Sequence, residues 1–133
     1  MMSEILAIAR EVTEALSEFG AVLEFFPEFD LRDLDERRVV VVPAGTQYRA
    51  LSRNTHEEFP AIQIGVLQRA TAADLPGLLQ FTEQLGLRFL NKRLGGAICS
   101  GVAYDPIYSP EHLRERGQFV SVIELTFKAV KQT

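Results

Sequence analysis

Few side chains in this sequence could serve as a nucleophile, a general base or a soft metal ligand. Cys99 is its single cysteine, and His56 and His112 are its two histidines. Cys99 lies in the apolar stretch AICSGVAY, and an unpaired cysteine in such a stretch is typically packed and unreactive. The two histidines lack the paired spacing that a zinc site requires. The sequence therefore predicts neither a nucleophilic site nor a metal site.

Paired acids and glycines are the remaining candidates for chemistry. The segment HEEF, which begins at His56, lacks the second histidine of a zinc-protease helix. The segment LGGAICSG lacks the Lys-Ser/Thr of a phosphate-binding loop, so its glycines are better explained as the end of a helix. The pairs Glu57/Glu58 and Asp33/Asp35 are typical of solvated turns. We therefore expect no catalytic residue, no cofactor and no enzymatic activity.

The size and composition are those of one globular domain. The chain has 133 residues, of which 47% are hydrophobic and 24% charged, so we expect a single α+β domain over residues 1–133. The net charge of -4 argues against broad nucleic-acid binding, which needs an excess of Lys and Arg. This charge is compatible with an acidic passage through which DNA slides.

The sequence also bears on the compartment. A single cysteine allows no internal disulfide and fits a reducing environment. No apolar run approaches the roughly 20 residues of a membrane helix. The N-terminal segment MMSEILAIAREV carries charges too early and too evenly for a signal peptide. We therefore expect a cytoplasmic protein with no membrane association.

The sequence predicts two long helices. Residues 3–19 place their apolar side chains on one stripe at helical spacing, which predicts an amphipathic helix. Thr71 and Asp74 form a capping-box-like pair that begins a second helix, and Gly95-Gly96 closes it. Both helices have an apolar face, so both need a sheet or another helix to cover it.

Apolar runs and alternation predict strands at 21–29, 38–43, 61–70, 97–104 and 118–130. The four valines of 38–43 indicate burial on both faces and hence a central position. Residues 44–60 are the least readable part and are interpreted as a hairpin arm plus a turn. Short turns between consecutive strands predict an α+β fold. We expect a mainly antiparallel sheet of about five strands with two helices packed on one face.

The segment DPIYSPEHLRERGQF (105–119) has two interpretations. Ser109 is a good N-cap and Pro110 fits the first helical position, so a helix of one or two turns leads into the last strand. Its charges are explained by solvation as well as by a partner. Tyr104 and Tyr108 flank a rigid Pro-containing turn, and tyrosines in this setting suit a protein interface.

Five pieces of the sequence, taken in order, carry a resemblance to a known family. They are the N-terminal amphipathic helix, the valine strand RVVVVPAG, the arginine-bearing stretch YRALSRNTHEEFPAIQIGVLQR, the helix DLPGLLQFTEQLGLRFL and the segment YDPIYSPEHLRERGQFVSVIELTF. In this layout the chain resembles the small tail-terminator and tail-completion proteins of long-tailed bacteriophages and prophages, a group that includes the minor tail protein U type. The resemblance covers most of the chain.

The resemblance implies a structural virion protein without catalytic residues. Such proteins assemble as a ring, often six-fold, on the end of the finished tail tube, where the ring stops tube growth and offers a surface to the head. The implied partners are copies of the same chain, the tail tube protein and a head-completion or neck protein, with DNA only in passage. The implied location is the host cytoplasm during assembly and then the virion tail.

A head-to-tail ring needs two different complementary patches on each subunit. The sequence offers the arginine-bearing stretch around 49–58 and the long last strand, if that strand lies at an edge. The expected subunit or partner contacts are Arg49, Arg53, Tyr104, Tyr108 and Arg114.

A function of a different class is the alternative. An α+β module of this size could bind a small ligand or a peptide in a pocket between the sheet and the 105–117 turn. Rings or capped tubes would support the assembly function, whereas a strict monomer with a tightly bound ligand would support the binding module.

Overall fold

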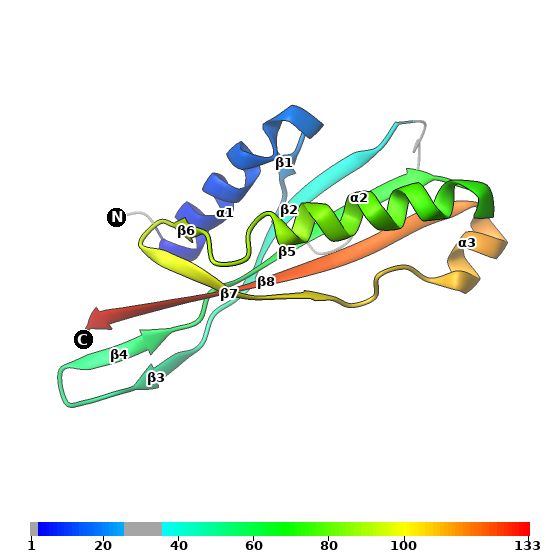
Figure 1. Ribbon diagram of the computed structural model, residues 1–133. Coiled ribbons are helices and arrows are strands. Elements are labelled where there is room, and N and C mark those ends of the chain that lie inside the picture. The colour runs from blue at the N-terminus through cyan, green and yellow to red at the C-terminus, as the bar shows by residue number, and fades with distance from the viewer. Residues whose placement is uncertain (1–2, 26–35) are drawn as a thin grey trace.

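The computed structural model describes residues 3–25 and 36–133, and Figure 1 shows how the elements of this part of the chain are arranged. In chain order the elements are α1 (Glu4–Ala15), η1 (Ser17–Phe19), β1 (Val22–Leu23), β2 (Arg38–Gly45), β3 (Tyr48–Ala50), β4 (Thr55–Glu58), β5 (Ala61–Arg69), η2 (Ala72–Asp74), α2 (Leu75–Leu87), β6 (Arg93–Leu94), β7 (Ala97–Tyr104), α3 (Pro110–Arg116) and β8 (Gln118–Gln132).

One mixed sheet contains all eight described strands. Its order is β1-β2-β5-β8-β4-β3, and β7 pairs with β8 and with β6. β1 and β2 are parallel, while the other pairs are antiparallel. The expected sheet of about five strands with two helices is therefore wrong, because residues 3–25 and 36–133 form eight strands and three α-helices. Three of the strands, β1, β3 and β6, have only two or three residues, too few for alternation to reveal them.

Strands β2 to β5 form one long bent hairpin. Two residues separate β2 from β3, and two separate β4 from β5. Backbone hydrogen bonds between Gln47 and Phe59 bridge the bend, with N–O distances of 2.8 and 3.3 Å. The turn at residues 51–54 closes the hairpin, so the part of the sequence that was hardest to assign does contain a hairpin arm and a turn.

The last strand, β8, lies in the middle of the sheet. It pairs with β5 over residues 118–126, with β7 over 123–128 and with β4 over 129–132. Strands β4 and β5 follow each other along one side of β8, and β7 lies on the other side over residues 123–128, so the middle of β8 is not an edge. Residues 129–132 pair with β4 alone among the described strands, and a subunit contact there stays a prediction. The sequence of β8 fits this position, because every second residue is buried from Phe119 to Ala129 and packs toward the core.

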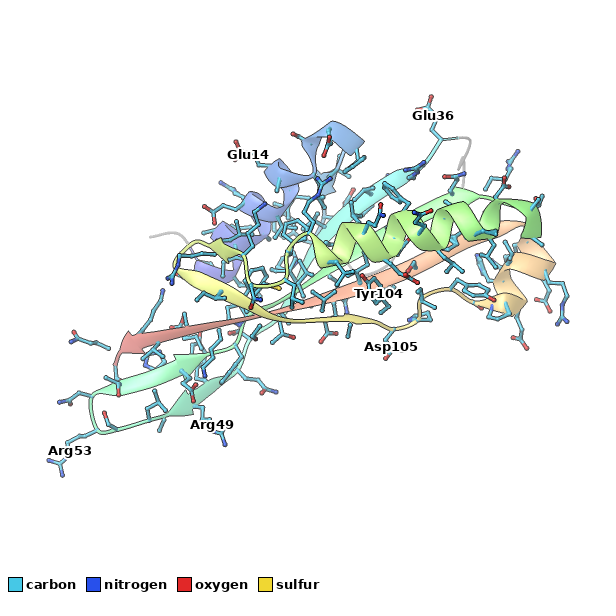
Figure 2. All side chains as sticks on the ribbon, in the orientation of Figure 1. Glu14, Glu36, Arg49, Arg53, Tyr104 and Asp105 are labelled. Atoms are coloured by element: carbon cyan, nitrogen blue, oxygen red, sulfur yellow. The ribbon has the colours of Figure 1, made fainter. Side chains whose placement is uncertain are left out.

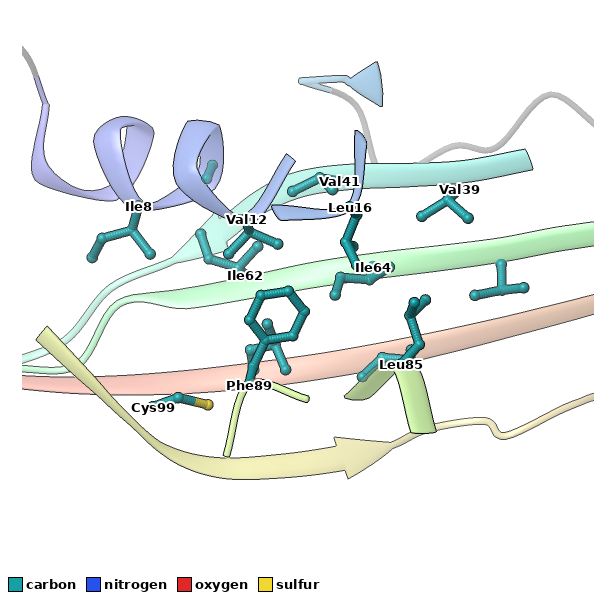
Figure 3. Packing of buried hydrophobic residues seen from close by; sticks show 14 of the residues in the cluster. Ile8, Val12, Leu16, Val39, Val41, Ile62, Ile64, Leu85, Phe89 and Cys99 are labelled. Carbon is teal, nitrogen blue, oxygen red and sulfur yellow. The ribbon is translucent and has the colours of Figure 1, made fainter. Parts of the chain in front are cut away.

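The core lies on the face of the sheet that α1 and α2 cover. The buried cluster includes Ile8 and Val12 of α1 with Leu16 directly after it, Leu85 and Phe89 in and after α2, and Val39, Val41, Ile62 and Ile64 of β2 and β5 (Figure 3). Each such side chain contributes about 1.5–3 kcal/mol when it is fully buried. Val40 and Val42 are buried on the opposite face with Leu67, so the prediction that the valine strand is buried on both faces is confirmed.

Local signals at the helix ends agree with the sequence in two places and differ in a third. The capping box of Thr71 and Asp74 is present, and the Ser109 hydroxyl accepts a hydrogen bond from the His112 N–H. Gly95 and Gly96 do not end a helix, because α2 ends at Leu87. Both glycines have positive φ angles, 56° and 83°, and form the turn between β6 and β7.

None of the helices in residues 3–25 and 36–133 is both long enough and apolar enough to span a membrane.

Candidate interaction surface

The long hairpin and the end of β8 build a three-stranded extension that leaves the body of the molecule. We call this extension the arm and define it as residues 48–58 and 129–133 (Figure 1). Directly paired residues in neighbouring strands point to the same face of a sheet. One face of the arm therefore carries Tyr48, Ala50, His56, Glu58 and Lys131, and the other face carries Arg49, Glu57 and Val130.

Polar contacts connect the first face of the arm to α1. The Lys131 ammonium lies 2.7 Å from the Glu4 carboxylate and 3.9 Å from that of Glu58. The hydrogen bond to Glu4 raises the pKa of Lys131 above its ordinary value. The His56 ring completes the set, because Nε2 lies 3.0 Å from Glu58 and Nδ1 lies 3.0 Å from the Thr133 hydroxyl. Lys131, His56 and Glu58 on this face thus have partners within the chain.

The second face and the tip of the arm leave two cations and two large apolar side chains in water. Glu57 is held by Lys128 at 2.9 Å, whereas Arg49 and Arg53 form no ion pair with the residues that the structure describes. Leu51 is 53% exposed and Val130 is 59% exposed. Figure 2 shows Arg49 and Arg53 projecting from the arm into solvent. Apolar and cationic side chains exposed together are typical of a surface that binds another protein.

The two tyrosines predicted as contacts are committed to their own chain. The Tyr104 hydroxyl donates a 2.5 Å hydrogen bond to the Glu83 carbonyl of α2, and burial raises the pKa of Tyr104 above its ordinary value. Tyr108 stacks on Phe119 with ring centroids 6.4 Å apart and an interplanar angle of 14°. Both side chains pack against the core, where they attach α2 and the segment before α3 to the sheet.

The predicted contact residues therefore fall into two groups. Arg49 and Arg53 lie on the arm, whereas Tyr104 lies on the body (Figure 2). Tyr108 packs against the core of the body. Arg114 is in the last turn of α3 and is exposed, without an ion pair to the described residues. The structure does not bring the five side chains into one surface, and their role as contacts stays a prediction.

The residues considered first for chemistry are also apart from one another. Cys99 is fully buried beside Phe89 (Figure 3), its Sγ lies 3.5 Å from the Gly101 carbonyl, and burial raises its pKa above the ordinary value. His112 Nε2 lies 2.8 Å from the Gln118 side-chain oxygen. No group of three His, Cys, Asp or Glu side chains within residues 3–25 and 36–133 could hold a metal ion. Asp33 and Asp35 lie outside the described residues.

Sequence reasoning missed three side chains that define the arm. Leu51 and Val130 were not recognised as exposed, and Tyr48, which is 67% exposed and packs edge-on to His56, was not selected. A signal existed for Leu51, since it stands between Arg49 and Arg53 in the hairpin segment. No local signal existed for Val130, because its exposure depends on where β8 runs past the body.

Comparisons with known proteins identify no family for the chain. No family model matches it, and no curated protein matches its sequence. The function must therefore be inferred from the surface chemistry of the chain itself.

Proposed function

We propose that this protein is a structural component of a long-tailed bacteriophage or prophage. In this role it caps the tail tube, ends tube polymerisation and forms the surface to which the head is joined. It acts as a ring of identical subunits, with DNA only in passage. Its partners are copies of itself, the tail tube protein and a head-completion or neck protein.

The arm is the observation that carries the proposal. A monomeric domain gains little by extending three strands past its core and leaving Leu51 and Val130 more than half exposed. The extension is useful if another subunit covers it. Because β8 runs from the centre of the core into the arm, the arm is attached to the body by a continuous strand and can hold a partner at a fixed angle.

The alternative, a ligand-binding module, has less support. Its pocket was expected between the sheet and the 105–117 turn. Tyr108 and Leu113 pack against the core there, and His112 is hydrogen-bonded to Gln118. Side chains that fill this space leave less room for a small molecule, so the assembly function is the better inference.

Deletion of the gene from the phage or prophage that carries it tests the proposal. Without the protein, tubes should continue to grow, and electron microscopy of lysates should show tails of irregular excess length without attached heads. A plasmid copy should restore uniform, joined tails. Normal tail length and normal head joining in the deletion strain would overturn the proposed function.

A further inference from the structure

The arm carries unneutralised positive charge in a chain that is negative overall. The chain has a net charge of -4. Glu57 pairs with Lys128 at 2.9 Å, and Glu58 lies 3.0 Å from His56, so both carboxylates of β4 have partners. Arg49 and Arg53 have none among the described residues. Together with the exposed Leu51 and Val130, these two arginines form what we call the basic arm surface.

The outer side of α1 carries the opposite charge. Glu11 and Glu14 are exposed, three residues apart in the helix, and form no ion pair with any described residue. We call this pair the acidic helix face. The other carboxylates nearby are already engaged, because Glu4 binds Lys131 at 2.7 Å and Glu18 binds Arg88 at 2.7 Å. Arg10 adjoins this face without pairing to either carboxylate.

The two charged surfaces cannot neutralise each other within one molecule. Figure 2 shows Glu14 on α1 directed away from the sheet, while Arg49 and Arg53 lie on the arm on the other side of the molecule. Opposite charges that are both left unpaired on distant parts of one chain can be brought together by a second copy of that chain.

We propose that the basic arm surface docks on the acidic helix face of a second copy of this chain. Arg49 and Arg53 fix the register against Glu11 and Glu14, because exposed ion pairs set orientation more than affinity. Leu51 and Val130 supply the apolar area that drives the contact, since their exposed surface leaves water.

The geometry of this contact has a consequence for assembly. The donor and acceptor surfaces differ, so the contact is heterologous and each copy can give its arm to one neighbour while it receives an arm from another. Such contacts close into rings when the rotation between copies allows it. The closed ring rests on the proposed function, whereas the contact itself can be tested on the purified protein.

Charge reversal on each surface tests the contact. One variant, arm-reversed, carries Arg49→Glu and Arg53→Glu, and the other, helix-reversed, carries Glu11→Arg and Glu14→Arg. A control with Glu83→Arg and Glu115→Arg makes the same change in net charge as the helix-reversed variant at exposed positions elsewhere. Arg49 lies directly opposite Glu57 in the register of β3 and β4, so Arg49→Glu places two carboxylates next to each other. A neutral variant with Arg49→Gln and Arg53→Gln avoids this repulsion and guards against unfolding of the arm. Circular dichroism checks the fold of all variants, and sedimentation velocity at low salt measures self-association.

We expect the wild type and the control to self-associate. Added salt should weaken the self-association of both proteins. Each reversed variant should associate roughly 30-fold more weakly, as two exposed ion pairs turn into repulsions. An equimolar mixture of the two reversed variants should recover association, because each arm then meets a face of opposite charge. A wild type that stays monomeric at its highest soluble concentration, or a mixture no stronger than its components, would overturn the contact.

The outcomes separate this inference from the proposed function. If the mixture fails to associate while gene deletion still gives overlong tails, the contact is wrong and the function stands. If the mixture associates while the deletion strain makes normal tails, the contact stands and the function is wrong.

Discussion

At Gly86, α2 and β7 approach each other too closely for a side chain. A Cβ atom at this position would lie 2.5 Å from the Tyr104 hydroxyl oxygen and 2.9 Å from a Val102 methyl carbon. The same hydroxyl donates to the Glu83 carbonyl, so it cannot move aside without losing a hydrogen bond. One glycine thus sets the distance between the second helix and the sheet.

Gly86→Ala should lower the free energy of unfolding by about 1–3 kcal/mol, because overpacking outweighs the better helix propensity of alanine. Gly77→Ala is the matched control in the same helix, where the added methyl group meets no atom within 4 Å. The control should raise stability by up to about 1 kcal/mol. Urea unfolding measures both, and equal stability of the two variants would contradict the close contact.

Thr82 presents a different problem, a buried hydroxyl without a partner. The residue is fully buried in α2, and its Oγ1 has no hydrogen bond among the described residues. Thr82→Val keeps the shape and removes the unsatisfied group, so the free energy of unfolding should rise by about 1 kcal/mol. Thr13→Val is the comparison, since the Thr13 hydroxyl donates to the Ala9 carbonyl at 2.8 Å and its loss should stabilise nothing. A Thr82→Val protein less stable than wild type in urea would refute this reading.

The buried thiol of Cys99 makes stability depend on alkaline pH. Burial raises its pKa above the ordinary 9.0, so the folded state keeps the proton to higher pH than the unfolded state does. The contribution of the neutral thiol is complete below the ordinary pKa and is lost as pH rises toward the folded-state pKa, by at most about 1.4 kcal/mol per pH unit.

The stability difference between wild type and Cys99→Ala should therefore be larger at neutral pH than at pH values above the ordinary 9.0 of the thiol. Tyr104 also has a raised pKa, but it is present in both proteins and cancels in the difference. Urea unfolding across this pH range provides the measurement, and a difference that does not change with pH would show that the thiol does not titrate in this way.

At the scale of elements, the arm depends on few contacts with the body. β3 is an edge strand of three exposed residues, and β4 reaches the body only through β8 and the bend at Gln47 and Phe59. Lys131 adds a link to α1 through Glu4. Short edge strands with few buried contacts open locally more often than core strands do. The arm should therefore be the part of the sheet most sensitive to loss of a single polar contact.

Lys131→Gln should speed amide hydrogen exchange in residues 48–58 and 129–133 while the core exchange rates stay unchanged. The Lys131–Glu4 pair is about one-third exposed, so its loss should cost no more than about 1 kcal/mol of global stability. Arg88→Gln breaks another 2.7 Å ion pair, with Glu18, away from the arm and serves as the control. Equal effects of the two variants on arm exchange would argue against the link.

At the scale of the whole molecule, two sets of charges of opposite sign, both without ion pairs among the described residues, lie far apart: Arg49 and Arg53 on the arm, and Glu11 and Glu14 on the outer side of α1. The net charge of -4 does not reveal this separation. Such a molecule has different ends, and different ends permit head-to-tail assembly. The proposed ring is a consequence of this asymmetry combined with the strand that links arm and core.

Arg53→Glu should leave the fold unchanged within about 0.5 kcal/mol, because the side chain is exposed in the turn and has no described partner. In the phage it should block tail completion, because a glutamate at this position would repel Glu11 and Glu14 of the neighbouring subunit in the proposed contact. Arg116→Glu on α3 makes the same charge change and should leave tail completion intact. Counting infectious particles measures the effect, and normal yields from the Arg53→Glu phage would refute the role of this residue.

The sequence by itself determined those features of the structure that depend on neighbouring residues. The amphipathic helix at the N-terminus, the capping box at Thr71 and Asp74, the N-cap at Ser109 and the double burial of the valine strand are all set by residues within a few positions of one another. Such features depend on spacing and backbone preference, which a single sequence contains. The hairpin arm at 44–60 also has a local cause, a turn between two strands.

Only the tertiary structure decided which strands are neighbours and which side chains remain in water. The sequence suggested an edge position for β8, but strands flank it on both sides over residues 123–128, because its partners include residues as far away as Thr55, which pairs with Gln132. Tyr104 and Tyr108 were predicted as contacts, and only the structure shows that both are half-buried against the core, since a tyrosine suits a core or an interface equally well. Val130 is exposed only because the last strand continues past the body, and no local pattern records where the body ends.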